Sequence, residues 1–204
     1  MANRVVTIGR QCGSGGHTIG KLVAQRLGVD FYDKKIVELT AAKTKLSPDF
    51  IRSHGEYFHG GAIGHIIGYG TRFGSGALKT GSALTDQLQQ AQSEILLEAA
   101  AKGPCVIVGR CADCVLAGKA DTLNVFIHSE MSFKIERSIA EHGLEREKAA
   151  SILIRRDKAR AQHYRFYTDQ RWGDARHYDL CLDSGRLGVE SCVALIVEAY
   201  RCMG

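Results

Sequence analysis

The chain has 204 residues, of which 45% are hydrophobic and 24% are charged. These values match the average of folded domains and exclude a disordered or fibrous chain, and the length favours one compact domain, residues 1–204. The formal net charge of +5 is too small to require nucleic acid as a partner, but it suits a small anionic substrate. We therefore expect a single globular domain that binds a small anion.

The sequence has no run of 18 apolar residues, and Met1 leads into Arg4 without a charged-then-apolar leader. Its seven cysteines are an odd number, and most lie in apolar runs, where cysteine behaves as a small hydrophobic residue. We expect reduced thiols, a cytoplasmic location and no membrane partner.

Five short β-branched runs predict strands, at 4–9, 29–32, 105–109, 123–127 and 178–182. The runs are continuous rather than alternating, which is typical of strands covered on both faces. Between them, apolar residues recur every three or four positions, as in helices, at 19–27, 84–101 and 189–200. This alternation predicts an α/β fold with a doubly wound parallel sheet.

Two segments interrupt the alternation. Residues 55–82 hold nine glycines in 28 positions, so a regular helix would carry a heavy entropic cost and we expect a flexible insertion. Residues 155–177 hold seven basic side chains against three aspartates. We expect this basic cluster to meet the anionic substrate.

A glycine-rich turn follows the first predicted strand and precedes the first helix. This order of elements places backbone N–H groups and the positive end of a helix where they can bind phosphate. Glycines without a Cβ allow the phosphate oxygens to approach the backbone. The predicted phosphate ligands of this turn are Arg10, Gly13, Ser14, Gly15, Gly16, His17 and Thr18.

The turn departs from the Walker A pattern G-x-x-x-x-G-K-[ST], which requires lysine where this chain has Gly16 or His17. Lys21 lies more than one turn into the helix and is expected to face away from the first N–H groups. Arg10, at the exit of the strand, is the better candidate for the missing cation.

A competing interpretation is a dinucleotide turn of the short-chain dehydrogenases. Gly9, Gly13 and Gly15 have suitable spacing, and Asp33 follows as a ribose-binding acid would. That class also needs a Tyr-x-x-x-Lys pair, and no tyrosine of the sequence has lysine four residues on. The sequence therefore favours the phosphate turn over the dehydrogenase.

Arg110 and Asp113 follow the third predicted strand, at the sheet edge where ligands of α/β proteins bind. Arg110 could hold a phosphate through two hydrogen bonds, or it could pair with Asp113 as a structural bridge. Cys111 and Cys114 form a C-x-x-C without a second pair at zinc spacing, so we expect structural roles for both.

Arg156 and Arg160 are one helical turn apart, so they share one face of the predicted helix. Such a face could hold several phosphates, with the aromatic residues of 163–167 closing over a nucleotide. The other interpretation is an ordinary solvated face.

Taken together, these residues resemble the P-loop nucleoside monophosphate kinases, and within them the cytidylate kinase-like proteins. The resemblance spans nearly the whole chain. It rests on Gly13-Ser-Gly-Gly16 with Ile19-Gly-Lys, Phe31-Tyr-Asp33, Gly109-Arg110-x-Ala-Asp113, Asp157-Lys-Ala-Arg160, Trp172-Gly-Asp, and Tyr178-Asp-Leu-Cys-Leu-Asp-Ser-Gly-Arg-Leu-Gly.

The resemblance implies a three-layer P-loop kinase fold, five-stranded and parallel, with a nucleotide-binding insertion near 55–82 and an arginine-bearing lid near 155–177. It implies ATP with Mg²⁺ on the glycine turn, and no metal ligands are assigned to the chain. The predicted catalytic residues are Arg110 and Arg160, which match motifs of the family, and Arg156, which shares the helix face of Arg160. The implied acceptor-binding residues are Asp33, Arg110, Asp113 and Asp157.

Three departures bear on the activity, because cytidylate kinases have lysine at the position of Gly16, aspartate at that of Cys111 and serine at that of Lys34. Asp113 is a possible replacement for the lost carboxylate. The leading hypothesis is an ATP-dependent phosphotransferase that converts a nucleoside monophosphate, CMP or dCMP by default, to the diphosphate. The alternatives are a nucleotide-binding protein of this fold without transfer activity, and a kinase of another small metabolite; no oligomeric state follows from the sequence.

Overall fold

The computed structural model describes residues 3–54 and 77–203. In this part of the chain, five strands form one parallel sheet in the order β2-β3-β1-β4-β5. The strands are β1 (Arg4–Arg10), β2 (Asp30–Tyr32), β3 (Cys105–Val108), β4 (Asp121–His128) and β5 (Leu180–Asp183). Each predicted run overlaps one of these strands, so the α/β fold with a five-stranded parallel sheet is confirmed.

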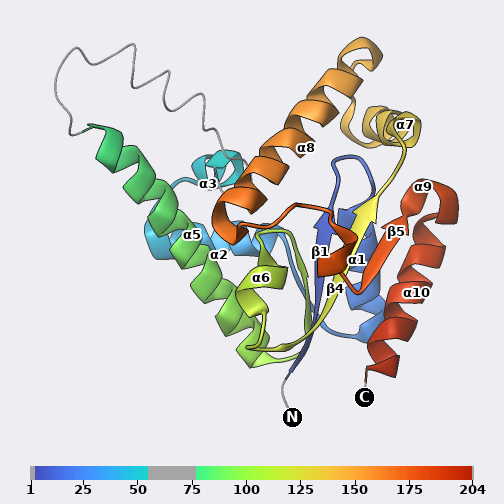
Figure 1. Cartoon of the computed structure of the whole chain (residues 1–204), viewed down its shortest axis with the longest axis horizontal. Coiled ribbons are helices and arrows are strands. Elements are labelled where there is room, and N and C mark those ends of the chain that lie inside the picture. Colours follow the sequence, from blue (N-terminus) through green and yellow to red (C-terminus); the bar gives the residue numbers. More distant parts are fainter. Residues whose placement is uncertain (1–2, 55–76, 204) are drawn as a thin grey trace.

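Helices cover both faces of the sheet (Figure 1). One face packs against α1 (Gly16–Leu27) and α10 (Val189–Cys202), through a buried cluster that includes Ile8, Val23 and Ile196. The other face packs against α2 (Lys34–Thr44), α5 (Ala77–Lys102) and α6 (Ala112–Leu116), around Ile107 and Leu96. The continuous apolar runs of the strands thus have apolar partners on both sides, which gives the predicted three layers.

The remaining helices stand at the ends of the strands. α3 (Pro48–His54) packs on α2, and α9 (Ser184–Leu187) follows β5 directly. α7 (Met131–His142) and α8 (Arg146–Thr168) pack on each other beyond the carboxyl ends of β1 and β4 (Figure 1). A 3₁₀ turn, Ala175–His177, lies between α8 and β5.

The sheet places its switch point at β1. Its two neighbours are β3 and β4, and the chain leaves β1 toward α1 on one face. Ligands of open α/β sheets bind in the crevice at such a point, at the carboxyl ends of the strands. The glycine turn after β1 therefore lies where the fold offers a binding site.

Both interrupting segments differ in extent from their predictions. Residues 55–76 of the predicted insertion lie outside the described residues, but 77–82 are the first residues of α5, so the expectation of no regular helix there is wrong. One glycine in a long helix costs only about 1 kcal/mol, which the helix-forming residues around it can offset. The basic segment, predicted over 155–177, is not a separate element, because its residues up to Thr168 form the second part of α8.

The buried thiols Cys105 and Cys192 pack in the two core clusters as small hydrophobic groups, and burial raises the pKa of Cys105 to about 12.

Within the described ranges, none of the helices has the length and apolar character needed to span a membrane.

Candidate functional site

The glycine turn joins β1 to α1 and opens on a cavity of about 340 Å³, here called the turn cavity. Gly13 and Gly15 have φ angles of 79° and 80°, in the left-handed region that glycine adopts without strain. Ser14 is buried between them, and its hydroxyl donates to the Gln11 carbonyl oxygen at 2.8 Å. The first N–H groups of α1 border this cavity, which is the arrangement of an anion site.

Arg10 packs directly on Gly16. A Cβ added at Gly16 would stand 2.4 Å from the Arg10 Cβ and 2.9 Å from its Cγ. The stem of Arg10 therefore fills the space into which a side chain at position 16 would extend, and Arg10 lines the turn cavity. Arg10 therefore lies at the turn, and its role as the cation missing from the Walker A pattern stays a prediction.

His17 and Asp33 meet at the edge of the turn cavity. Asp33 stands at the N-cap position of α2, but its Oδ2 contacts the Nδ1 of His17 instead of capping the helix. The His17 ring also packs edge-on against Phe31, with centroids 5.6 Å apart. Asp33, predicted for the acceptor, thus lines the same cavity as the turn, away from Arg110 and Asp113.

Asp157 lies behind the turn and holds it. Its Oδ2 is 3.0 Å from the Nζ of Lys134 on α7, and its Oδ1 accepts a hydrogen bond of 2.6 Å from the Cys12 backbone N–H. Lys134 is only 5% exposed and also donates to the Gln11 Oε1 at 3.2 Å. Both members of this buried ion pair make a further hydrogen bond to the turn, so the pair fixes the turn to α7 and α8.

Three polar residues of α7 lie at the site and were not predicted from the sequence. Lys134, Arg137 and Glu141 are spaced three and four residues apart, and all three lie at the turn, where Arg137 donates to the Thr18 Oγ1 at 2.9 Å. A polar stripe on a helix usually faces solvent, so the pattern was not informative alone. The usable signal was its place directly after β4, the neighbour of β1.

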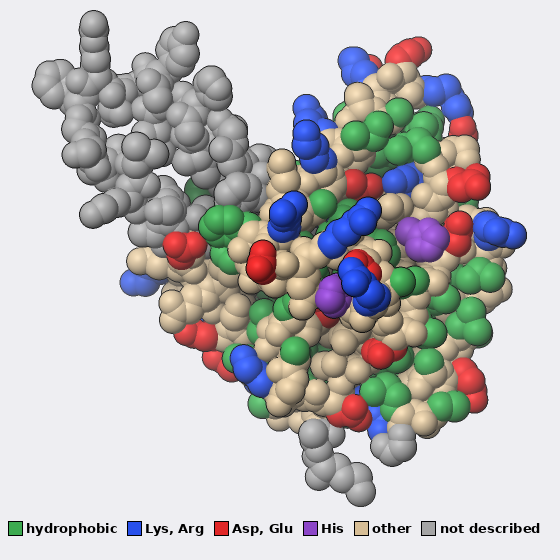
Figure 2. Space-filling model, viewed as in Figure 1, with side chains coloured by type: hydrophobic (Ala, Val, Ile, Leu, Met, Phe, Trp, Pro, Cys, Tyr) green, Lys and Arg blue, Asp and Glu red, His purple; other side chains and the backbone are tan. Residues whose placement is uncertain are grey.

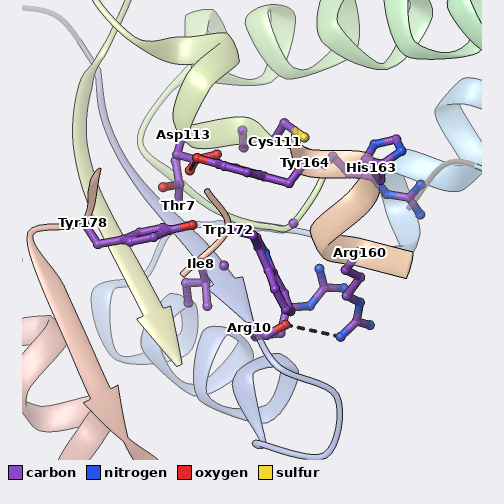
Figure 3. Close-up of a pocket in the computed structure, with 14 residues that line it drawn as sticks. Thr7, Ile8, Arg10, Cys111, Asp113, Arg160, His163, Tyr164, Trp172 and Tyr178 are labelled. Carbon is purple, nitrogen blue, oxygen red and sulfur yellow. Dashed lines mark hydrogen bonds between the residues drawn. The ribbon is translucent and has the colours of Figure 1, made fainter. Parts of the chain in front are cut away.

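A second cavity of about 40 Å³, here called the strand-end cavity, lies where β1 and β3 end beneath α8 (Figure 3). Arg110 lines it and is 6% exposed. Gly109, Arg110 and Cys111 have φ angles of 77°, 61° and 53°. For the two residues that carry a Cβ this conformation costs about 1–2 kcal/mol each, and such strain is concentrated at functional sites.

Asp113 and Tyr164 face each other in the strand-end cavity (Figure 3). The Tyr164 hydroxyl donates to the Asp113 Oδ2 at 2.7 Å. Burial raises the pKa of Asp113, and the hydrogen bond from Tyr164 opposes this only in part. Burial is also the main cause that raises the pKa of Tyr164 and Tyr178. The cavity therefore holds a desolvated carboxyl group beside aromatic hydroxyls.

The two sides of α8 differ. Arg155, Lys158 and Arg165 are exposed, and Figure 2 shows basic side chains gathered along this helix. Arg156 and Arg160 are half-buried and line the turn cavity. The predicted cavity face and the predicted solvated face are therefore both present on the same helix.

Arg10 and Arg160 line both cavities. The Arg160 Nη1 donates to the Arg10 carbonyl oxygen at 3.3 Å, the bond drawn in Figure 3. Trp172 lines the strand-end cavity beside them and packs edge-on against Phe126. The two cavities therefore adjoin at a pair of arginines.

The turn cavity is strongly basic. The cationic side chains along its wall are Arg10, Lys34, Arg137, Arg156 and Arg160, and the acidic ones are Asp33 and Glu141. A wall with more positive than negative groups attracts polyanions.

Mg²⁺ fits this site only as an ion held largely by the substrate. No group of three or more His, Cys, Asp or Glu side chains able to hold a metal occurs among residues 3–54 and 77–203. The Thr18 hydroxyl and the Asp33 carboxylate line the turn cavity and offer oxygen atoms. Mg²⁺ is commonly bound by one or two such oxygens together with substrate phosphates.

A family model described as the cytidylate kinase-like family matches residues 5–186. The chain belongs to the cytidylate kinase-like family. Membership of a kinase-like family supports phosphoryl transfer as the reaction class, and the resemblance found in the sequence is confirmed. A search of curated proteins found no match.

Solved structures share the fold of this cytidylate kinase-like protein. An uncharacterized protein from Eubacterium ventriosum is 22% identical, with a TM-score of 0.73, and the match covers 98% of this chain and 99% of that one. A shikimate kinase from Bacteroides thetaiotaomicron is 16% identical, with a TM-score of 0.56 and coverage of 98% and 99%. A gluconokinase from Sinorhizobium meliloti is 15% identical, with a TM-score of 0.56 and coverage of 98% and 94%.

Proposed function

We propose that this protein is an ATP-dependent kinase that phosphorylates a nucleoside monophosphate, with CMP or dCMP as the first acceptors to test. The observation that carries the proposal is the meeting of a basic phosphate cavity and a second cavity at Arg10 and Arg160. A phosphoryl group that passes between two ligands needs such a junction, with positive charge on its path.

In this mechanism the turn cavity holds the phosphates of ATP on the N–H groups of α1, and the acceptor phosphate binds beside Arg110. An oxygen of the acceptor phosphate attacks the γ-phosphorus, and the bond from that phosphorus to the bridging oxygen of ADP breaks. Arg160 and Arg156 offset the negative charge that spreads over the transferred group. Mg²⁺, carried on ATP, contributes further charge neutralisation when bound.

Asp157 has a supporting role in this proposal, because both of its oxygens are engaged by the Lys134 ammonium and the Cys12 N–H. It keeps the turn rigid and thereby keeps Arg160, one helical turn away, beside the junction. Asp113 remains the candidate for contact with the acceptor, since its carboxyl group lines the strand-end cavity.

The test is ADP release with Mg-ATP across all nucleoside and deoxynucleoside monophosphates, comparing Arg160→Ala with Lys158→Ala. Both residues lie on α8, but Arg160 reaches the junction and Lys158 is exposed. We expect Arg160→Ala to lose most turnover while Lys158→Ala keeps it. Full turnover in Arg160→Ala would remove this arginine from the mechanism.

A kinase of a smaller metabolite is the second candidate, because the strand-end cavity measures only about 40 Å³. The same assay with small hydroxylated acids and sugar acids separates the two. Turnover confined to those acceptors would select the second candidate. ATP binding without transfer to any acceptor would select the remaining hypothesis, a nucleotide-binding protein of this fold without transfer activity. That hypothesis is suggested by the glycine at position 16, where the Walker A pattern has lysine.

A further inference from the structure

Arg137 is a largely buried cation that touches the glycine turn. It comes from α7, and its side chain is 15% exposed. Its Nη2 donates to the Thr18 Oγ1 at 2.9 Å and lies 2.6 Å from the Glu141 Oε1. Two different elements, α1 and α7, thus fix the position of one guanidinium group.

The guanidinium group lies over Gly15. A Cβ added at Gly15 would stand 3.1 Å from the Arg137 Cζ, 3.2 Å from Nε and 3.4 Å from Nη1. Both contacts named above use Nη2, so the Nη1 group, which lies near Gly15, keeps N–H donors that neither contact uses. These donors and the charge of the guanidinium group are placed to act on a phosphate oxygen at the turn.

A purely structural ion pair would explain less. Arg137 and Glu141 are four residues apart on α7, and such pairs at helix surfaces contribute little to stability. Here both residues line the turn cavity together with Arg10. The pair faces the place where an anion would bind, and Glu141 orients the arginine there.

The loop also lacks a cation of its own at position 16. Arg10 covers Gly16, and Arg137 covers the preceding residue, Gly15. Each glycine of the pair thus has an arginine stem or guanidinium group in the space that its own side chain would take. The positive charge at the turn is therefore supplied by side chains of β1 and α7.

We propose that Arg137 binds the phosphates of ATP and shares with Arg10 the charge that the Walker A lysine supplies elsewhere. This inference rests on the proposed function, since it assumes that ATP occupies the turn cavity. Thr18 and Glu141 act as positioning residues, because they hold the Nη2 atom and leave the Nη1 donors to the ligand.

The experiment is calorimetric titration of the full chain with Mg-ATP and, separately, with inorganic tripolyphosphate. Arg137→Ala and Arg137→Lys are compared with Arg146→Ala, a matched control on α8. Arg146 also pairs with a glutamate, Glu136, but its side chain is 65% exposed and lies outside the turn cavity. Thermal unfolding of each variant checks that the fold is intact.

We expect Arg137→Ala to weaken both ligands by about tenfold or more, the equivalent of about 1.4 kcal/mol. Arg137→Lys should lose less, because it keeps the charge but not the planar fork. Arg146→Ala should bind both ligands like the unaltered protein. Equal binding by Arg137→Ala and Arg146→Ala would overturn the inference.

A role limited to holding Thr18 is tested in a Thr18→Val background. Arg137→Ala must weaken tripolyphosphate binding there as well, and an unchanged affinity would reduce Arg137 to a support of Thr18 and overturn the proposal. If the unaltered protein binds neither ligand, the proposed function fails and takes this inference with it. If it binds ATP but phosphorylates no monophosphate, only the acceptor assignment fails, and the binding comparison still decides the role of Arg137.

Discussion

Gly16→Lys restores the Walker A lysine and should nevertheless harm this protein. The Cβ of any residue at position 16 would stand 2.4 Å from the Arg10 Cβ. Carbon atoms in contact lie about 3.5–4.0 Å apart, so the backbone segments that carry positions 10 and 16 would have to separate by about 1 Å or more. Overpacking of this kind costs about 1–3 kcal/mol.

The magnitude can be followed by thermal unfolding. For a domain of this size, 1 kcal/mol shifts the Tm by about 2–4 °C, so Gly16→Lys should lower it by about 2–12 °C. Gly103→Lys is the control, because a Cβ at Gly103 meets nothing within 4 Å and the backbone there is not left-handed. It should change the Tm by less than about 2 °C.

The double variant Arg10→Gly with Gly16→Lys completes the test. Glycine at position 10 removes both atoms that the new side chain would strike, and the lysine returns a cation to the turn. The sequence then reads G-x-x-x-x-G-K from position 10, as in the Walker A pattern. We expect the double variant to regain Mg-ATP affinity that each single variant loses, with a coupling energy of at least about 1 kcal/mol in a double-mutant cycle. Additive effects, or a Gly16→Lys variant as stable as Gly103→Lys, would refute the reasoning.

Three further changes test other parts of the structure. Asp113→Asn should flatten the pH dependence of stability: burial raises the pKa of Asp113, so the unaltered protein should lose stability relative to the variant as pH rises from about 4, and parallel curves in urea unfolding from pH 4 to 7 would contradict this. Lys134→Met leaves the Asp157 carboxylate buried without its cation and should cost about 3–5 kcal/mol in urea unfolding, whereas a loss under about 1 kcal/mol would mean the pair is solvated. Gly173→Ala should lower the Tm, since the new Cβ would stand 2.9 Å from the Phe126 ring at a φ of 74°; an unchanged Tm would show that the ring yields freely.

The fold was predictable from the sequence because a continuous apolar run marks each strand. Such runs need apolar partners on both faces, and only helices packed on both sides of a parallel sheet supply them. The glycine turn was equally visible, since its place between a strand and a helix fixes what its N–H groups can bind. The start of α5 could not be predicted, because the nine glycines of 55–82 hide the few helical residues at the end of that segment.

The side chains around the turn show where sequence reasoning ends. That Arg10 and Gly16 compete for one space follows from a distance between two elements, and no spacing along the chain contains it. Asp157 was assigned to the acceptor from its motif, but its partners are Lys134 and Cys12, which lie 23 and 145 residues away in the chain. Long-range partners of polar groups are decided by packing, and the motif could specify only the helix.

The attachment of Asp157 has a mechanical consequence. Asp157 is the central residue of α8 (Arg146–Thr168), a rod about 34 Å long, and it is tied there to α7 and to the turn. A second attachment lies about two helical turns farther on, where the Tyr164 hydroxyl donates to the Asp113 Oδ2 at 2.7 Å. Arg160 lies between the two attachment points, so the length of helix that carries it is held to the turn at one end and to the strand-end cavity at the other. The helix thus acts as a brace that sets the separation of the two cavities at the arginine they share.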